Sequence, residues 1–357
     1  MNIVKKKLTS EHATFVETVL ASRHVTYLFI GFLLATLPFL NNIGLIRGDT
    51  VMIFGRIVFF AIAALGLNVL LGYSGLISLG TAGFMGLGAY LTSHFTIELE
   101  WPFLLALPIA VIIPTILGLL VGLTSLRLAG MYLAIATLAI SEVMGQVFVE
   151  IWAWTSLRPP LPNILYPIGV LELDRNGMYY FIVLLLVLLM ILTDNFVHSP
   201  IGRALLTMRA SEPAAQAMGI NLFKYKLMAF GIATAYAALA GILYAHLIRA
   251  VDPSPWDLLL ALQVLAVIVI GGLKTIIGPI IGAIVVFGVP PLILNNLPII
   301  GDIAGLAFIF NGILIIVIIL FYPRGLVYVG HDVRRLFSRR EVETSGEEKA
   351  SSEVEES

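Results

Sequence analysis

The sequence contains no cysteine and few charged residues. None of its 357 residues is a cysteine, which excludes disulfides, thiolate catalysis, iron–sulfur clusters and cysteine-ligated zinc. Charged residues make up 12% of the chain, whereas an ordinary soluble domain carries about 25%. The net charge of −1 leaves no excess of basic residues for a face that binds nucleic acid. We therefore expect neither cysteine chemistry nor a nucleic-acid partner.

Catalytic and nucleotide-binding motifs are also missing. The sequence has no His-Glu-x-x-His, no Gly-x-Ser-x-Gly and no paired-carboxylate constellation. The segment closest to a P-loop is 271–275, and it lacks both the glycine directly before the lysine and the upstream glycine. We therefore predict that the chain is not an enzyme, has no ATPase site of its own, and binds no metal or cofactor.

Long hydrophobic runs are what the sequence has in abundance. Hydrophobic residues make up 59% of the chain, and a spanning helix needs about 20 mostly apolar residues to cross the hydrocarbon core. Two Gly-rich stretches, 76–96 and 258–297, could include broken or re-entrant helices, which are tolerated where protein surrounds them. We predict an all-α fold, a polytopic membrane bundle of about ten transmembrane helices: 25–46, 51–72, 76–96, 101–123, 131–152, 178–196, 225–248, 258–274, 276–297 and 303–321.

Lysine and arginine are distributed unevenly over the segments between these spans. If the amino terminus is inside, sixteen of them fall on the cytoplasmic side, and four fall outside, at Arg47, Arg158, Arg175 and Arg249. Because loops on the cytoplasmic side carry the excess of basic residues, this distribution predicts a multi-pass membrane protein with both termini in the cytoplasm.

Composition divides the chain into three parts. Residues 1–24 are a cytoplasmic amino-terminal segment, residues 25–328 are the transmembrane domain with a cytoplasmic loop at 197–224, and residues 329–357 are a cytoplasmic tail. The tail is basic and then acidic, and because 338–357 is rich in Ser and Glu with almost no apolar residues, we predict that it is disordered. Its basic part would anchor the last helix to anionic lipid or form a site for a partner: Arg334, Arg335, Arg339 and Arg340.

The segment 71–90 is unusually rich in glycine. Small residues let helices approach closely within lipid, and Gly80, Gly83 and Gly86 recur every three residues. One interpretation is tight helix packing alone. The other is that this segment lines a central pathway, with polar contacts from Asn68, Ser74, Ser78 and Thr81.

Arg56 and Glu142 are the clearest cases of charged residues deep inside predicted spans, where charge is costly and favours a functional interpretation. Arg56 and Glu142 could pair across the bundle, because each would otherwise be an isolated buried charge. Such a pair would act as an interhelical lock or take part directly in transport. Since Glu142 is essentially the one carboxylate at mid-depth, the sequence does not favour a proton relay.

The cytoplasmic loop contains a short helix with signals at both ends. Ser211 can cap it, Pro213 is acceptable in its first turn, and Gly219 suits the left-handed residue that ends a helix. A helix of about two turns is unstable alone, so we expect it to dock, through a small apolar face made by Ala214, Ala215 and Met218. Asn221 can cap the next helix. The predicted helix runs over 212–218.

This loop resembles one in a known family. Glu212-x-Ala214-Ala215-x-x-x-Gly219 is similar to the Glu-Ala-Ala…Gly loop of ABC importer permeases, although Pro213 lengthens the triplet by one residue. In that family the loop forms a coupling helix that fits a cleft on a separate ATP-binding subunit. The resemblance implies that the residues coupling this chain to the ATPase subunit are Arg203, Arg209, Glu212, Ala214, Ala215 and Gly219.

The resemblance extends over about 50–328. Five segments, in matching order, are similar to branched-chain amino-acid permeases of the LivM type: 66–90, 126–139, 202–219, 271–282 and 321–326. It implies a permease in the cell (inner) membrane that imports branched-chain or other hydrophobic amino acids. Implied partners are a second, LivH-type permease, two ATP-binding subunits that use the ATP, an extracytoplasmic substrate-binding protein and membrane lipid. The alternatives are a related urea or short-amide importer, an ion-coupled secondary transporter or, least favoured, a membrane-embedded enzyme.

Overall fold

The structure is a computed structural model that describes residues 23–44, 48–125, 131–152, 157–163, 173–294, 306–322 and 325–328. Several predictions lie outside the described residues, namely those for 1–22, for the motif at 126–130 and for the tail 329–357 with its four arginines.

The described chain is all-helical, as predicted, with a single antiparallel bridge between Leu157 and Val251 in place of any strand. Its helical elements are α2 (Arg23–Ala35), α3 (Leu37–Asn42), α4 (Gly48–Asn68), the π-helical turn η1 (Val69–Tyr73), α5 (Thr81–Ile97), α6 (Phe103–Ser125), α7 (Met131–Trp152), α8 (Arg175–His198), α9 (Pro200–Ala210), α10 (Glu212–Ala217), α11 (Leu222–Ile248), α12 (Leu258–Gly271), α13 (Gly278–Ala283), the π-helical turn η2 (Ile284–Gly288), α14 (Val289–Leu294), α15 (Leu306–Phe321) and the 3₁₀ turn η3 (Leu326–Tyr328).

Six of these helical stretches are long and apolar enough to cross a membrane. They match the predicted spans one, two, four, five, six and seven: Arg23–Asn41, Gly48–Tyr73, Phe103–Leu123, Met131–Glu150, Arg175–His198 and Leu222–Ile248. The other four predicted spans coincide with shorter apolar helices, α5, α12, α13 to α14, and α15. The polytopic helix bundle is therefore confirmed. The shorter helices lie where the sequence is rich in glycine or, for α15, where part of the predicted span lies outside the described residues.

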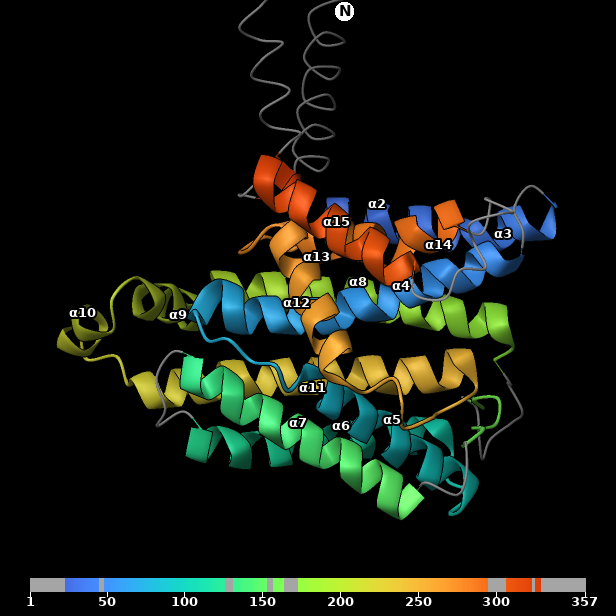
Figure 1. Cartoon of the computed structure of the whole chain (residues 1–357), viewed down its shortest axis with the longest axis horizontal. Helices are drawn as coiled ribbons and strands as arrows, with labels where there is room; N and C mark the ends of the chain where they lie inside the picture. Colours follow the sequence, from blue (N-terminus) through green and yellow to red (C-terminus); the bar gives the residue numbers. More distant parts are fainter. Residues whose placement is uncertain are drawn as a thin grey trace, which may run out of the picture.

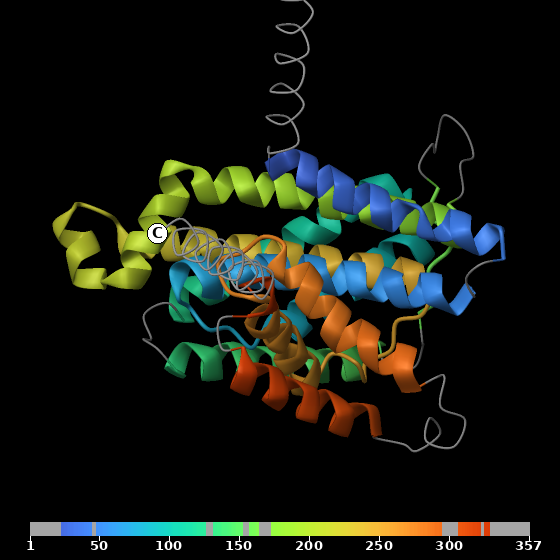
Figure 2. The ribbon, with the colours of Figure 1, turned by 90° about the horizontal axis from the view of Figure 1, so that it is seen from above.

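The helices lie side by side in a bundle around α11 (Figures 1 and 2). α11 packs on α4, α5 and α6, while α8 lies between α2 and α4. Glycines permit the closest of these contacts: a Cβ at Gly241 would lie 2.8 Å from the Cα of Met85, and one at Gly88 would lie 2.9 Å from the carbonyl carbon of Ala238. The Gly-rich segment therefore packs tightly through its small residues, as one of its two interpretations predicted.

The third predicted span begins as non-helical chain and continues as helix. After η1 the chain runs without helical structure from Gly75 to Gly80, and α5 begins only at Thr81, well inside the bundle (Figure 1). Two amides of this span find hydroxyl acceptors on α7: the amide of Leu79 donates to Thr137 (3.0 Å), and that of Gly83, in the first turn of α5, donates to Ser141 (2.9 Å). Non-helical backbone is tolerated here since protein satisfies it.

The predicted spans at 258–297 are interrupted as well. α12 stops at Gly271, and α13 starts seven residues later at Gly278. Between them Gly272 and Lys274 have positive φ, 119° and 64°, which turns the chain sharply. The hydroxyl of Thr275 accepts from the amide of Gly278 (3.1 Å) and closes this turn.

Candidate functional site

The chain projects beyond one end of the bundle as an arm formed by α9 and α10 (Figures 1 and 2). α8 ends at His198, and Ser199 caps α9 by accepting from the amide of Ile201 (3.2 Å). Pro200 occupies the first position of α9, where its missing N–H costs nothing because that group would have no partner in the helix. The junction from membrane helix to arm is thus fixed by local hydrogen bonding.

The ends of α10 have the caps predicted from the sequence. The hydroxyl of Ser211 accepts from the amide of Ala214 (3.3 Å), and Pro213 lies in the first turn. Gly219 has a φ of +78°, the left-handed conformation expected after a helix. Asn221 then caps α11 by accepting from the amide of Lys224 (3.1 Å). These predictions are confirmed, and the helix is one residue shorter than predicted.

The apolar face predicted for α10 is only partly formed. Ala215 is fully buried and packs toward the bundle, whereas Ala214 is exposed and Met218 is 72% exposed. Docking of all three residues within one face stays a prediction about a partner, because a six-residue helix at the tip of the arm has only one side against its own chain. The other side, including Met218, faces outward.

Glu212 contacts its own chain. Its carboxylate lies 2.6 Å from the ammonium group of Lys226 on α11, with the Glu212 side chain 53% exposed and that of Lys226 14% exposed. An ion pair with one exposed partner stabilises a protein by at most about 1 kcal/mol. The pair therefore sets the position of α10 relative to α11 more than it stabilises the fold.

Arg209 joins the arm to the membrane helices. From α9 its guanidinium donates to the carbonyl oxygen of Gly72 in η1. Its aliphatic stem lies over Gly75, where a Cβ would come within 3.1 Å of the Arg209 Cγ, and Gly75 has a φ of +77°. Burial lowers the pKa of the Arg209 guanidinium from its ordinary value. The guanidinium nevertheless stays charged, because the ordinary pKa of arginine is so high. Arg209 therefore points inward, whereas Arg203 is exposed and donates to the carbonyl of His198 (3.1 Å).

The contacts continue from η1 to the interruption after α12. The Asn68 side chain donates to the carbonyl of Thr275 (2.7 Å) and accepts from the amide of Lys274 (3.1 Å). The hydroxyl of Tyr73 donates to the carbonyl of Lys274 (2.7 Å). Movement of the arm would thus reach α4 and the α12–α13 turn through hydrogen bonds.

The four residues predicted to line a pathway are all buried, but they do not form one lining. Asn68 is occupied with the α12–α13 turn, and the Ser74 hydroxyl donates to the carbonyl of Leu70. Ser78 and Thr81 do share a cavity, at the start of α5. Its volume of about 10 Å³ suits roughly one water molecule. Its apolar walls come from α4, η1, α5 and α11: Leu67, Leu70, Phe84, Phe230, Ala233 and Ala237.

The predicted Arg56–Glu142 pair does not form. Arg56 on α4 and Glu142 on α7 are both exposed, and the ion pairs among the described residues join other groups. The prediction assumed that both side chains point into the bundle. Each lies on an outward surface of this chain, so neither requires a partner within it.

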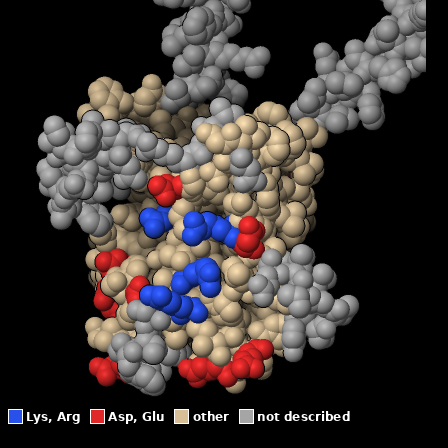
Figure 3. Space-filling view, turned by 90° about the vertical axis from the view of Figure 1, so that its right-hand side faces the viewer, with Lys and Arg blue, Asp and Glu red and all other residues tan. Residues whose placement is uncertain are grey.

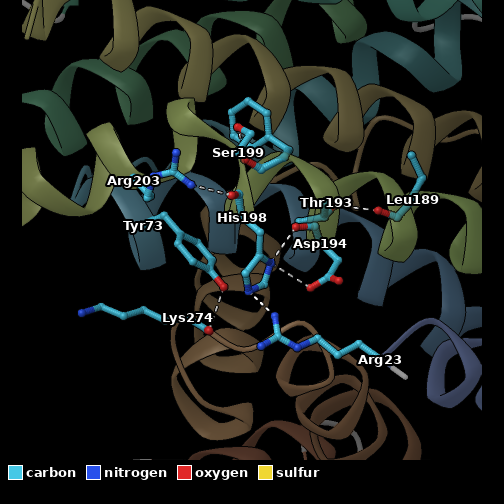
Figure 4. Close-up of polar contacts among 10 residues, drawn as sticks. Arg23, Tyr73, Leu189, Thr193, Asp194, His198, Ser199, Arg203 and Lys274 are labelled. Atoms are coloured by element: carbon cyan, nitrogen blue, oxygen red, sulfur yellow. Dashed lines mark hydrogen bonds and ion pairs between the residues drawn. The ribbon is translucent and has the colours of Figure 1, made fainter. Parts of the chain in front are cut away.

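A cluster of polar groups that the sequence did not single out lies beside the arm (Figure 4). His198 Nδ1 lies 2.8 Å from the carbonyl oxygen of Asp194 and 3.2 Å from its carboxylate, and its Nε2 contacts the guanidinium of Arg23. The sequence signal was the spacing of Asp194 and His198, which places them one helical turn apart on α8. Their convergence with Arg23, some 170 residues earlier, needed the fold.

The opposite end of the bundle, facing the viewer in Figure 3, has a different charge pattern. Lys and Arg side chains gather near its middle, and Asp and Glu side chains lie both beside them and along its edge. No group of three His, Cys, Asp or Glu side chains suited to a metal ion occurs in the described part of the chain.

Comparison with known proteins identifies relatives of the chain. The family model described as the permease component of branched-chain amino acid transport systems matches residues 50–321. The high-affinity branched-chain amino acid transport system permease protein LivM of Escherichia coli K12 is 29% identical over 308 residues, 79% of this chain and 71% of that protein. LivM of Salmonella typhimurium LT2 is 28% identical over 293 residues, 75% of this chain and 67% of that protein.

A third relative is archaeal. The probable branched-chain amino acid transport permease protein LivM of Methanocaldococcus jannaschii is 31% identical over 146 residues, 38% of this chain and 41% of that protein. No solved structure matches the chain significantly. The family match covers the described helices from the third residue of α4 to the end of α15.

Proposed function

The chain belongs to the family of permease components of branched-chain amino acid transport systems, and from this premise we propose how it works. It is an integral membrane protein and one subunit of an ATP-driven importer. α10 is the coupling helix that separate ATP-binding subunits grip. The observation that carries the proposal is the arm: a helix fixed at both ends by caps, attached on one side through Ala215, and exposed on the other.

The arm supplies a mechanical route into the membrane. A motor subunit that pulls on α10 moves α9, and Arg209 passes that movement to the carbonyl of Gly72. Asn68 carries it on to the turn between α12 and α13. Transport needs a bundle with two arrangements, biased by contacts that differ between them. The interrupted spans at 75–80 and 272–277 are where such a bundle can bend.

The orientation of the chain follows from the same proposal. If α10 meets an ATP-binding subunit, the arm and both termini are cytoplasmic, and the end shown in Figure 3 is external. This agrees with the excess of basic residues on the arm's side of the membrane. The external end would then meet an extracytoplasmic substrate-binding protein, and an exposed membrane surface would meet a second permease of the LivH type.

The proposed substrate is a branched-chain or similarly hydrophobic amino acid. The small cavity at the start of α5 combines hydroxyls from Ser78 and Thr81 with apolar walls. Its lining has the chemistry that an amino acid with an apolar side chain needs, and the bundle would have to open there before such a substrate could enter. ATP would be bound and hydrolysed by the partner subunits, and this chain would need no cofactor of its own. A urea or short-amide importer is the alternative within the same family resemblance.

An ion-coupled secondary transporter is the alternative from another class. It would need carboxylates or unwound carbonyls at mid-membrane to bind the ion. Glu142, the carboxylate that the sequence placed at mid-depth, is exposed on α7. The carboxylate criterion therefore favours the ATP-driven proposal, whereas the non-helical backbone at 75–80 is compatible with both, so the driving force is decided by the uptake measurement below.

A crosslinking experiment tests the proposal directly. The natural sequence has no cysteine, so a single cysteine can be introduced at Gln216, which is exposed on α10. With the chain assembled with its partner subunits, we expect Gln216→Cys to crosslink to an ATP-binding subunit. A matched cysteine at Glu98, exposed beyond the far end of α5, should not do so.

Uptake measurements separate the two driving forces. Membranes that contain the assembled transporter should take up leucine only when the ATP-binding subunits can hydrolyse ATP. If uptake persists with hydrolysis-deficient motor subunits, the chain is a secondary transporter and the proposal fails. If urea is taken up and leucine is not, the substrate assignment is wrong while the coupling proposal stands.

A further inference from the structure

A cavity of about 520 Å³ opens beside the arm, where α2 begins and α8 ends (Figure 4). This volume is within the range of small-molecule sites. Its walls come from four parts of the chain, α2, η1, the α8–α9 junction and the α12–α13 turn, and they carry both polar and apolar side chains.

The cavity has more positive charge than negative. Arg23, Arg203 and Lys274 contribute three cations, and Asp194 contributes one carboxylate. That carboxylate already has partners, because it lies 3.2 Å from His198 Nδ1 and interacts with the hydroxyl of Tyr27. The ammonium group of Lys274 has no acceptor in the described part of the chain. A guest of this cavity would therefore be an anion.

The contacts of His198 support the same conclusion. Its Nδ1 lies 2.8 Å from a backbone carbonyl, that of Asp194, which requires the proton on Nδ1. Its Nε2 meets the guanidinium of Arg23, which can only donate. His198 therefore holds Arg23 beside the cavity, and the guanidinium of Arg23 keeps its charge.

The depth of the cavity indicates where the anion comes from. Arg23, Tyr73 and His198 are the terminal residues of three membrane-spanning segments, so the cavity lies at the level of lipid headgroups. Val197, Leu206 and Ile276 give it apolar walls. Basic pockets between spanning helices on the cytoplasmic side are where anionic phospholipids are held.

We propose that this cavity binds the phosphate-bearing headgroup of an anionic phospholipid, which bridges α2, α9 and the α12–α13 turn. The proposal rests on the proposed function only in that this end of the bundle is cytoplasmic. Arg203 is part of the arm, and the Lys274 backbone is bonded to Asn68 and Tyr73. A bound headgroup would thus stiffen the path from α10 to the membrane helices, and coupled transport would depend on anionic lipid.

Native mass spectrometry of the full-length protein, purified with its bound subunits, tests the site with phosphatidylglycerol as the probe. We expect the wild-type protein to retain this lipid in preference to phosphatidylcholine. Arg23→Gln combined with Lys274→Gln should lower its retention about tenfold, since each change removes a charge-assisted contact. Arg175→Gln, at the opposite end of α8 and exposed, is the matched control and should retain the lipid as the wild type does.

Asp194→Asn gives an effect of the opposite sign, which a misfolded variant could not produce. Loss of the negative charge should strengthen retention of an anion, because the amide can still accept from Tyr27. If this variant weakens binding, and leucine displaces the lipid, the cavity is a site for a zwitterionic amino acid and the proposal is overturned. The proposal is also overturned if inorganic phosphate competes for the cavity as well as the lipid does, or if Arg175→Gln loses as much phosphatidylglycerol as the double variant does.

Transport assays distinguish failure of this proposal from failure of the proposed function. In proteoliposomes, adding phosphatidylglycerol to phosphatidylcholine should raise ATP-dependent leucine uptake for the wild type and for Arg175→Gln, and much less for the double variant. If lipid retention behaves as expected while no protein transports leucine, the lipid site stands and the transport assignment fails. If transport is normal and insensitive to the lipid in every variant, the coupling role of the headgroup is wrong.

Discussion

Where α11 crosses α5, glycines bring two backbones together, whereas along the arm side-chain hydroxyls and an amide cap the start of each helix. The first region is buried on all sides: Gly88 faces the backbone of Ala238, and Gly241 faces that of Met85. The second region exposes most of α10 and attaches it through Ala215 and one ion pair. Close packing resists any change of shape, while capped helices on an arm can move as rigid pieces. The comparison indicates that the chain separates a rigid, closely packed region, where α5 and α11 cross, from an arm, α9 and α10, that can move.

Gly241→Val tests the packed region and should have the largest effect. The new Cβ would lie 2.8 Å from the Cα of Met85, so α5 and α11 must separate. We expect the free energy of unfolding to fall by about 3 kcal/mol, the upper part of the range for overpacking. Thermal unfolding in detergent measures this effect. Gly145→Val on α7, where nothing lies within 4 Å, is the control; equal losses would mean that close packing is not the cause.

Gly219→Val tests the arm and should have a smaller and local effect. A side chain has space there, since nothing lies within 4 Å, but the φ of +78° costs a β-branched residue about 1–2 kcal/mol. We expect normal membrane yield and loss of ATP-driven leucine uptake. Gly219→Asn, which tolerates this conformation, should keep most of the uptake. Normal uptake by the valine variant would show that α10 does not couple transport.

Ser211→Ala removes the cap of α10 and should weaken that helix alone. Loss of such a cap costs about 1 kcal/mol, which should raise hydrogen exchange at the amides of the first turn, including Ala214. Exchange within α5 and α11 should not change. Ser211→Asp supplies another acceptor and should restore protection. Faster exchange throughout the bundle would contradict the separation of the two regions.

Glu212→Lys should have the smallest effect on stability, under about 1 kcal/mol, because the ion pair with Lys226 is partly exposed. Its effect on uptake should be larger. Combining it with Lys226→Glu restores the ion pair with the two charges exchanged, so the effects on stability and on leucine uptake can be compared. If uptake recovers with stability, the pair only positions α10. If stability recovers and uptake does not, the carboxylate of Glu212 contacts the motor subunit.

The local structure of the arm could be predicted from the sequence. Ser211, Pro213, Gly219 and Asn221 act within a few residues of themselves, so their patterns carry the information. The breaks at 75–80 and 272–277 were foreseen as a property of Gly-rich segments, since glycine weakens a helix without regard to its neighbours. The family resemblance was found on the same segments and is confirmed by the match over 50–321.

Contacts between distant segments could not be predicted in the same way. Arg209 was expected to face the motor, but it reaches Gly72, and nothing in its local sequence indicates the direction of a long flexible side chain. Arg56 and Glu142 were paired because both looked buried, and hydropathy cannot tell an inward face from an outward one when both are apolar. Asp194 and His198 stand at helical spacing, but their meeting with Arg23 depends on how α2 lies on α8.

The extended stretch before α5 has a consequence for synthesis of the chain. The amides of Leu79 and Gly83 depend on the hydroxyls of Thr137 and Ser141, each 58 residues further along. When the ribosome has just released this stretch, those acceptors have not yet been made. The translocon must therefore shelter the half-finished span, or leave it in water, until α7 arrives. Insertion of this protein is expected to proceed in a block that ends with α7, and a chain truncated before Thr137 should fail to hold its third span in the bilayer.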